Sequence, residues 1–214
     1  MMGLFSKKQS GPYKENSTNL IYELLFCDHL ELYIENNTQK DVFPWNVLFA
    51  DPPNTAELQK IILDDDAESR VKLLAYNKLR SIGTEVEGKD LHGVIVEVGL
   101  DDGLDVLASY KDGTARYINH TGKMIIWETT DQVSSEITQQ LFRDSVNIVN
   151  RIGPWNKPRL PYPVKGNVRI SFLVSDGIYF GEGPINTMFN DQLAAPALSS
   201  ATALMQYLTN KSLE

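Results

Sequence analysis

Hydrophobic and polar positions follow two different periods along the chain, and the period changes at Gly83. Before it, apolar side chains recur every three or four residues; they are Val71, Leu74, Ala75, Leu79 and Ile82. Because a helix completes a turn in about 3.6 residues, this spacing places them on one helical face. The acidic run 64–66 suits the positive end of such a helix, and Gly83 suits its last turn. We therefore predict a helix between residues 64 and 83.

Two shorter segments of the same region also favour helices. Residues 55–63 follow a proline-containing break, and Asn54 and Glu57 have the spacing of a capping box. Residues 20–26 are apolar, but this run is too short for its length to separate a helix from a buried strand. We favour a helix there and keep the strand as the alternative.

After Gly83 the apolar positions alternate with a period of two, which is typical of β-strands. Asp-Gly or Thr-Gly dipeptides interrupt the alternation at 102–103, 112–113 and 121–122. Such dipeptides suit tight hairpin turns. The pattern predicts an antiparallel meander of four strands, near 94–98, 104–110, 115–118 and 123–128.

The last third of the chain predicts a helix, a connector and a second hairpin. Asp131 suits a helix N-cap, and a helical stripe continues to Ile152 before Gly153. Residues 153–163 contain four prolines, which favours an extended connector because proline lacks the amide donor that helices and central strands need. The remaining predicted elements are strands near 168–174 and 178–180, a short helix after Pro184 and a closing helix over 194–207.

The two hairpins have matching patterns. Residues 94–106 and 168–180 align without gaps, so that their apolar positions and their Asp-Gly turns coincide. An internal duplication would explain the match, but any two hairpins share much of this pattern. Ordinary α+β construction is therefore the preferred interpretation.

Together these elements predict an α+β protein. Its sheet is mostly antiparallel, with a four-strand meander and a second hairpin, and helices pack on one face. We divide the chain into a flexible tail over 1–17, a helical segment over 18–83 and an α+β domain over 84–214. One continuous domain over 18–214 is the alternative.

Composition and charge narrow the classes of partner. The 214 residues include 28 Asp and Glu against 20 Lys and Arg, so the formal net charge is −8. This charge opposes binding to nucleic acid or to an anionic membrane surface, and no apolar run is long enough for a membrane span. Cys27 is the only cysteine, and His29, His92 and His120 lack metal-ligand spacing. We expect a cytoplasmic protein without a metal or a cofactor.

Several stretches also carry a resemblance. They are GLDVLASYKDGTARYINHTGKMIIWE at 103–128, NRIGPWNKPRLPYP at 150–163, FLVSDGIYFGEGP at 172–184 and AESRVKLLAYNKLRS at 67–81. Together they resemble a family of uncharacterised bacterial hypothetical proteins, and the resemblance covers most of the chain after residue 18. It implies a bacterial, cytoplasmic protein. Because that family has no assigned activity, the resemblance assigns no catalytic residue.

Paired carboxylates are the enzymatic hypothesis with the most support. A tight turn favours Asp before Gly or within the loop, so turn chemistry explains Asp102 and Asp176. It does not explain Glu182, which lies between two glycines after an aromatic strand. A hydrolase that uses Glu182 with Asp102 or Asp176 would need a concave pocket lined by these acids.

A second set of candidates is predicted on the sheet. If the even-numbered apolar positions over 94–98, 104–108 and 168–172 face the helices, the opposite face carries Glu97, Asp105, Arg116, Trp127, Arg169 and Tyr179. Trp127 and Tyr179 together with Arg116 and Arg169 have the composition of a binding hot spot, although a solvated face is the alternative. Trp155 lies beside a PxxP spacing in the connector, where it either binds a partner or packs the connector onto the sheet.

The sequence thus favours a non-enzymatic cytoplasmic interaction or regulatory protein, which binds another protein through the sheet face or the connector. The alternative is a small-molecule sensor or a hydrolase that uses a carboxylate pair around Glu182. The two hypotheses differ in the partner class, protein in the first and a small molecule in the second.

Overall fold

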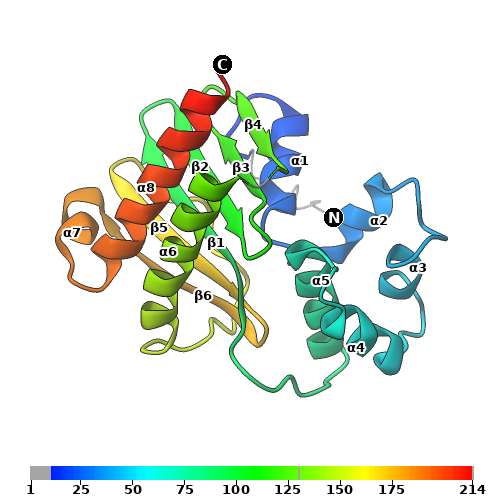
Figure 1. Ribbon diagram of the computed structural model, residues 1–214. Coiled ribbons are helices and arrows are strands. Elements are labelled where there is room, and N and C mark those ends of the chain that lie inside the picture. The colour runs from blue at the N-terminus through cyan, green and yellow to red at the C-terminus, as the bar shows by residue number, and fades with distance from the viewer. Residues whose placement is uncertain (1–10, 130, 214) are drawn as a thin grey trace, which may run out of the picture.

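The computed structural model describes residues 11–129 and 131–213. These residues form eight helices and one six-stranded sheet in which all neighbouring strands are antiparallel (Figure 1). The α+β class predicted from the sequence is therefore confirmed. Within the described residues, no helix has both the length and the apolar character that a membrane span requires.

Five helices precede the sheet: α1 (Asn16–Leu24), α2 (Leu30–Asn36), α3 (Trp45–Leu48), α4 (Thr55–Leu63) and α5 (Ser69–Ser81). The predictions over 55–63 and between 64 and 83 are confirmed as α4 and α5. The Asn54 side chain accepts hydrogen bonds from the amides of Ala56 and Glu57, which fixes the start of α4. Periodicity missed α2 and α3, because seven and four residues are too few to show a helical stripe.

The sheet consists of β1 (Leu91–Leu100), β2 (Gly103–Tyr110), β3 (Ala115–Ile118), β4 (Met124–Trp127), β5 (Asn167–Val174) and β6 (Gly177–Pro184), in the order β4-β3-β2-β1-β5-β6. The four-strand meander and the second hairpin are both confirmed. Gly113 and Gly122 have φ angles of 89° and 86°, so these two turns need the left-handed conformation that glycine adopts without strain.

Three helices complete the chain: α6 (Gln132–Val149), α7 (Ile185–Asn190) and α8 (Ala194–Lys211). Asp131 is the predicted N-cap of α6, and its carboxylate accepts the Ser134 amide at 2.8 Å. The predicted short helix after Pro184 and the closing helix correspond to α7 and α8.

The central pair of strands is symmetric. β1 and β5 pair around Val96 and Ile170, with Val94 opposite Phe172 and Val98 opposite Val168. Adding 74 to the number of the β1 residue in one pair gives the β5 residue of the other pair, so Val94 corresponds to Val168 and Val98 to Phe172. The same offset of 74 residues aligns the two hairpins in the sequence. The matching pattern therefore corresponds to a local two-fold arrangement of the sheet, while a common origin of the hairpins stays a prediction.

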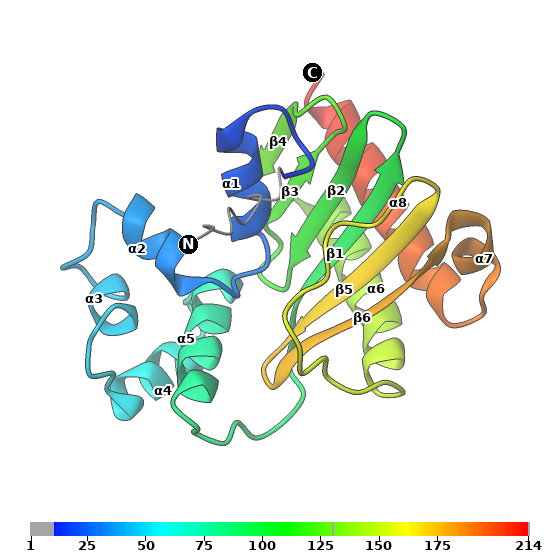
Figure 2. The same cartoon turned by 180° about the vertical axis from the view of Figure 1, so that it is seen from behind.

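The two faces of the sheet have different covers (Figures 1 and 2). Helices α6 and α8 pack on one face, where a cluster of apolar side chains includes Val94, Val168, Leu141 and Leu204. The N-terminal helices and the connector cover the other face, and the cluster there joins helical residues with strand residues such as Ile95. Residues 18–83 thus share one hydrophobic core with the strands.

The predicted flexible tail needs a correction. Residues 1–10 lie outside the described part of the chain, but residues 11–17 are held in place. The Tyr13 ring is buried and its hydroxyl donates to the Leu104 carbonyl at 2.9 Å, while the Asn19 side chain bonds both the amide and the carbonyl of Tyr13. The boundary at residue 17 is therefore wrong, because an aromatic anchor lies ahead of α1.

Candidate functional site

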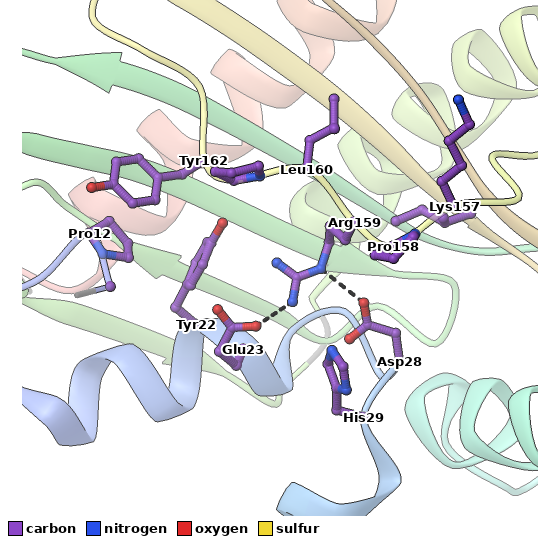
Figure 3. Close-up of a pocket in the computed structure, with 13 residues that line it drawn as sticks. Pro12, Tyr22, Glu23, Asp28, His29, Lys157, Pro158, Arg159, Leu160 and Tyr162 are labelled. Atoms are coloured by element: carbon purple, nitrogen blue, oxygen red, sulfur yellow. Dashed lines mark hydrogen bonds and ion pairs between the residues drawn. The ribbon is translucent and has the colours of Figure 1, made fainter. Parts of the chain in front are cut away.

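A groove of about 410 Å³ lies where the N-terminal segment meets the connector (Figure 3). One wall comes from α1 and the loop after it, and the other comes from the connector. We call it the Arg159 groove, and its lining residues are Gly11, Pro12, Tyr22, Glu23, Asp28, His29, Lys157, Pro158, Arg159, Leu160, Pro161, Tyr162 and Ile178. The lining combines prolines and tyrosines with charged side chains from both walls.

The connector is fixed to the edge strand β6 before it reaches the groove. The Trp155 amide donates to the Ile178 carbonyl at 2.7 Å, and the indole nitrogen donates to the Pro158 carbonyl at 3.0 Å. The indole ring also packs edge-on against Phe180, with 5.2 Å between the ring centroids. Trp155 therefore packs the connector onto the sheet, which is the alternative considered from the sequence.

Arg159 joins the two walls. Its Nε donates to the Asp28 carboxylate at 2.9 Å, and its terminal nitrogen bonds the Glu23 carboxylate (Figure 3). The guanidinium also lies over the Phe26 ring, 3.8 Å from the ring centroid. Since Arg159 is more than 130 residues from both acids, this contact fixes the separation of the walls through charge-assisted hydrogen bonds.

Beneath the groove, three charged side chains form a row across the sheet. The register places Glu97 of β1 opposite Arg169 of β5, and Arg169 opposite Glu182 of β6. Arg169 bonds Glu182 at 2.6 Å, and it lies 3.6 Å from Glu97. Its guanidinium also donates to the connector carbonyls of Leu160 and Pro161, at 3.2 and 2.6 Å. The row therefore positions the wall of the groove.

Tyr22 connects the groove with this row. Its ring lines the groove, and its hydroxyl donates to Glu97 Oε1 at 2.6 Å. Glu97 is fully buried, and burial raises the pKa of its carboxyl, while the Tyr22 hydrogen bond and the Arg169 charge act against that rise. Burial, together with the Glu97 charge, raises the pKa of Tyr22 as well. Both groups therefore hold their protons more tightly than they would in water.

Most of the charges in and beneath the groove are paired, although Glu97 Oε2 has no hydrogen-bond partner among the described residues. Arg159 occupies the two acids of the groove, and Arg169 occupies the two acids beneath it. The accessible lining includes the exposed side chains of Lys157 and His29 and the exposed apolar surface of the connector at Leu160 and Tyr162. Such a site can hold an extended ligand through both apolar and polar contacts.

Glu182, Asp102 and Asp176 have separate surroundings in the structure, and a catalytic role for them stays a prediction. Glu182 is bound by Arg169 and by the Asn167 side chain. Asp102 lies in the turn after β1, whereas Asp176 lies in the turn that follows β5 opposite the start of β1. The two turns are therefore at opposite ends of the sheet, and the Asp176 carboxylate accepts the Tyr179 hydroxyl at 2.7 Å. Glu182, which turn chemistry did not explain, is the charge partner of an arginine.

The predicted grouping of arginine and aromatic side chains is also wrong. Arg116 and Arg169 share the face that Glu97 occupies, but Trp127 and Tyr179 lie on the face covered by α6 and α8. The reason is the two-residue loops, which pair even positions of β1 with odd positions of β2, and likewise for β5 and β6. Asp105 accordingly shares the face of Val98. The prediction assigned even-numbered positions of β1, β2 and β5 alike to the face covered by helices.

Each of these residues has an identifiable local contact. Arg116 bonds Glu128 at 2.6 Å, and its guanidinium donates to the Trp127 carbonyl at 3.2 Å. The Trp127 ring packs edge-on against Tyr207 of α8, with 6.1 Å between centroids. Burial, followed by the Asp176 hydrogen bond, raises the pKa of the fully buried Tyr179 to about 12. A binding role for these residues stays a prediction.

Sequence reasoning missed Tyr22, Arg159 and the central role of Glu97. One signal for Glu97 was available, because an acid inside an otherwise apolar strand needs a cation nearby, and Arg169 lies inside the apolar strand of the second hairpin. Arg159 had no such signal, since its partners are distant in the chain and belong to a surface that the sequence does not show.

Neither a search for metal sites nor comparison with known proteins assigns a function. In the part of the chain that the structure describes, no group of three or more His, Cys, Asp or Glu side chains could hold a metal ion. The chain matches no protein-family model and no curated protein.

Proposed function

We infer that this protein is a non-enzymatic binding protein of the bacterial cytoplasm, with an interaction or regulatory role, and that the Arg159 groove receives an extended segment of a partner protein. The observation that carries this proposal is the construction of the groove. Arg159 joins two walls from distant parts of the chain at a fixed separation, and it already pairs with the two acids that line the groove.

The connector wall is suited to an extended protein segment. Among the described residues, the large hydrophobic side chains with high exposure include Leu160, Tyr162 and Val164, which follow one another on the connector. Prolines separate them and keep the backbone extended. Because the prolines hold the connector extended before binding, this wall loses little conformational entropy when a segment binds.

Charge determines which segment fits. Residues 11–66, which supply the helical wall, contain eleven Asp and Glu against three Lys, a formal net charge of −8. The remaining residues contain equal numbers of acidic and basic side chains, so this segment carries the formal net charge of the whole protein. A negative potential beside the groove favours a partner segment rich in Lys and Arg, and it raises the association rate at low salt.

A site-specific photo-crosslinker tests this proposal in host cells. We expect a reactive residue at Tyr162 to crosslink one partner through a Lys- or Arg-rich segment, and we expect the crosslink yield in a cell lysate to fall as the salt concentration rises. The matched control places the same residue at Leu63, which is exposed on α4 outside the groove. Equal adducts at both positions, or an adduct through an acidic segment, would contradict the proposal.

Affinity measurements with the identified segment complete the test. Replacing Leu160 and Tyr162 by alanine should weaken binding about tenfold or more, because aromatic contacts dominate such interfaces. Leu63→Ala should leave the affinity unchanged. An unchanged affinity in the Leu160→Ala, Tyr162→Ala double variant would place the interface elsewhere.

A further inference from the structure

A second cavity lies within the N-terminal helices, apart from the Arg159 groove. It has a volume of about 380 Å³, which is within the range of small-molecule sites. It is bounded by α2, α3 and α5, which lie beside one end of the sheet (Figures 1 and 2). Its lining residues are Leu24, Leu32, Tyr33, Asn36, Asn37, Thr38, Gln39, Trp45, Glu68, Arg70, Val71 and Leu74.

Arg70 in this cavity has no anionic partner within the described residues. No Asp or Glu oxygen there lies within 4.0 Å of its guanidinium, and residues 1–10 contain no acid at all. Its Nε is buried and lacks a hydrogen-bond partner among the described residues. The contrast with Arg159 and Arg169 is direct, because each of those is bound by two carboxylates.

The groups in direct contact with Arg70 are neutral. Its terminal nitrogen contacts the Tyr33 hydroxyl at 3.3 Å, and its guanidinium lies 5.9 and 5.7 Å from the centroids of the Tyr33 and Tyr110 rings. Burial raises the pKa of Tyr33, of Tyr110 and of the nearby Cys27 thiol, so none of them supplies a negative charge near neutral pH. Asp112 is engaged elsewhere, at the amide of Ser69.

Arg70 is partly buried, and a partly desolvated guanidinium without an anion is destabilising. A bound ligand that brings the anion offsets this cost. We propose that the cavity binds a small monocarboxylate, whose carboxylate pairs with Arg70. The walls fit the rest of such a ligand. Leu24, Leu32 and Val71 are apolar, and Tyr33 and Trp45 stack with 6.1 Å between their ring centroids.

The same lining argues for a single negative charge. Glu68 also borders the cavity, so a phosphate or a polycarboxylate would bring its second charge near a like charge. Three amide side chains, Asn36, Asn37 and Gln39, and the Thr38 hydroxyl provide hydrogen-bonding groups for a polar substituent away from the carboxylate. Arg70 is the one cation in the lining, which matches one carboxylate.

Calorimetric titration of the full-length protein with defined probes tests the site. The probes are isovalerate, phenylacetate and indole-3-acetate, each compared with its neutral amide, and inorganic phosphate. We expect at least one acid to bind about ten- to hundredfold more tightly than its amide, as for hydrogen bonds to a charged group. If each acid binds no better than its amide, or if phosphate binds as tightly as the best acid, the proposal fails.

Arg70→Met separates a ligand site from a structural role. Because the guanidinium has no anion in the unliganded protein, the variant should be at least as stable as the wild type without ligand, and it should lose the preference for acid over amide. Arg143→Met is the matched control, since Arg143 is exposed on α6, and it should bind the acid normally. A marked loss of stability in unliganded Arg70→Met would show that Arg70 is structural. If that variant does not fold, the acid and amide titrations of the wild type decide alone.

Discussion

The two faces of the sheet bury different kinds of side chain. On the face beneath α6 and α8, apolar side chains from strands and helices pack together, and Leu141 is fully buried among them. On the opposite face, the charged row Glu97–Arg169–Glu182 lies between the sheet and the connector. Burying charges yields less stability than burying apolar groups, so the charged face is the one shaped by positioning rather than by stability alone.

The candidate site lies on the charged face. The apolar face is closed by two 18-residue helices. The charged face holds the connector through hydrogen bonds to its carbonyls, and the Arg159 groove opens beside this attachment. We therefore expect substitutions on the two faces to change the free energy of unfolding by different amounts and with a different dependence on pH.

The largest effect is expected from Arg169→Met. This substitution removes the cation between two acids and leaves buried Glu97 with an uncompensated charge, while the Leu160 and Pro161 carbonyls lose their donor. We expect the free energy of unfolding to fall by about 3–5 kcal/mol at pH 7, as measured by urea denaturation. Arg143→Met, on the exposed side of α6, should change it by less than about 0.5 kcal/mol. Equal losses in the two variants would remove the distinction between the faces.

On the apolar face, Leu141→Ala should cost about 3 kcal/mol. The substitution leaves a cavity beneath α6, and the lost contacts are nonpolar. The loss should therefore be the same at pH 5 and pH 7 when urea denaturation is repeated at both values. A loss that changes with pH would show that titrating groups reach this face.

A smaller effect is expected from Tyr22→Phe. The variant keeps the ring in the groove but removes the donor to Glu97 Oε1, so a buried carboxylate loses a hydrogen bond. We expect a loss of about 1–3 kcal/mol in the free energy of unfolding. Tyr162→Phe is the control, because Tyr162 is exposed on the connector. A stability of Tyr22→Phe equal to that of the control would mean that this hydrogen bond contributes nothing.

The smallest effect concerns the pH dependence of Glu97→Gln. Burial raises the pKa of Glu97 in the folded protein above its ordinary value of 4.5, so the folded state binds this proton more tightly than the unfolded state does. The contribution of Glu97 to stability is therefore full below pH 4.5, and it is lost as the pH rises through the folded pKa. Glutamine does not titrate.

The difference in stability between Glu97→Gln and the wild type should accordingly shift in favour of the variant as the pH rises from 4.5 toward neutrality. The slope should not exceed about 1.4 kcal/mol per pH unit, the limit for a single proton. Urea midpoints of both proteins across this range give the result. A difference that stays constant, or that shifts toward the wild type, would show that Arg169 outweighs burial.

Local patterns predicted much of the fold. The period-two runs and the glycine turns located the meander and the second hairpin, and the capping residues Asn54 and Asp131 located two helix starts. These features depend on residues close in the chain, so the sequence shows them directly. Helices α2 and α3 were not predicted because they are short. The burial of Tyr13 was not predicted because its hydrogen-bond partner Leu104 is 91 residues away in the chain.

The candidate site was predicted only in part. Arg169, Glu182 and Trp155 were named from the sequence and lie in or beside the site, but their partners were not identified. The face assignment failed at Asp105, Trp127 and Tyr179, because a two-residue loop reverses the parity between paired strands. A register has to be known before alternation can be converted into faces.

The sequence by itself determined the elements, the turns, the fold class and the concentration of negative charge in residues 11–66, because all of these are set by neighbouring residues or by composition. The tertiary structure alone decided which charges meet. It paired Arg159 with Glu23 and Asp28, placed Arg169 between Glu97 and Glu182, and left Arg70 without a carboxylate within 4.0 Å among the described residues. The physical reason is that electrostatic interactions depend on distance in space and on burial, and neither follows from separation along the chain.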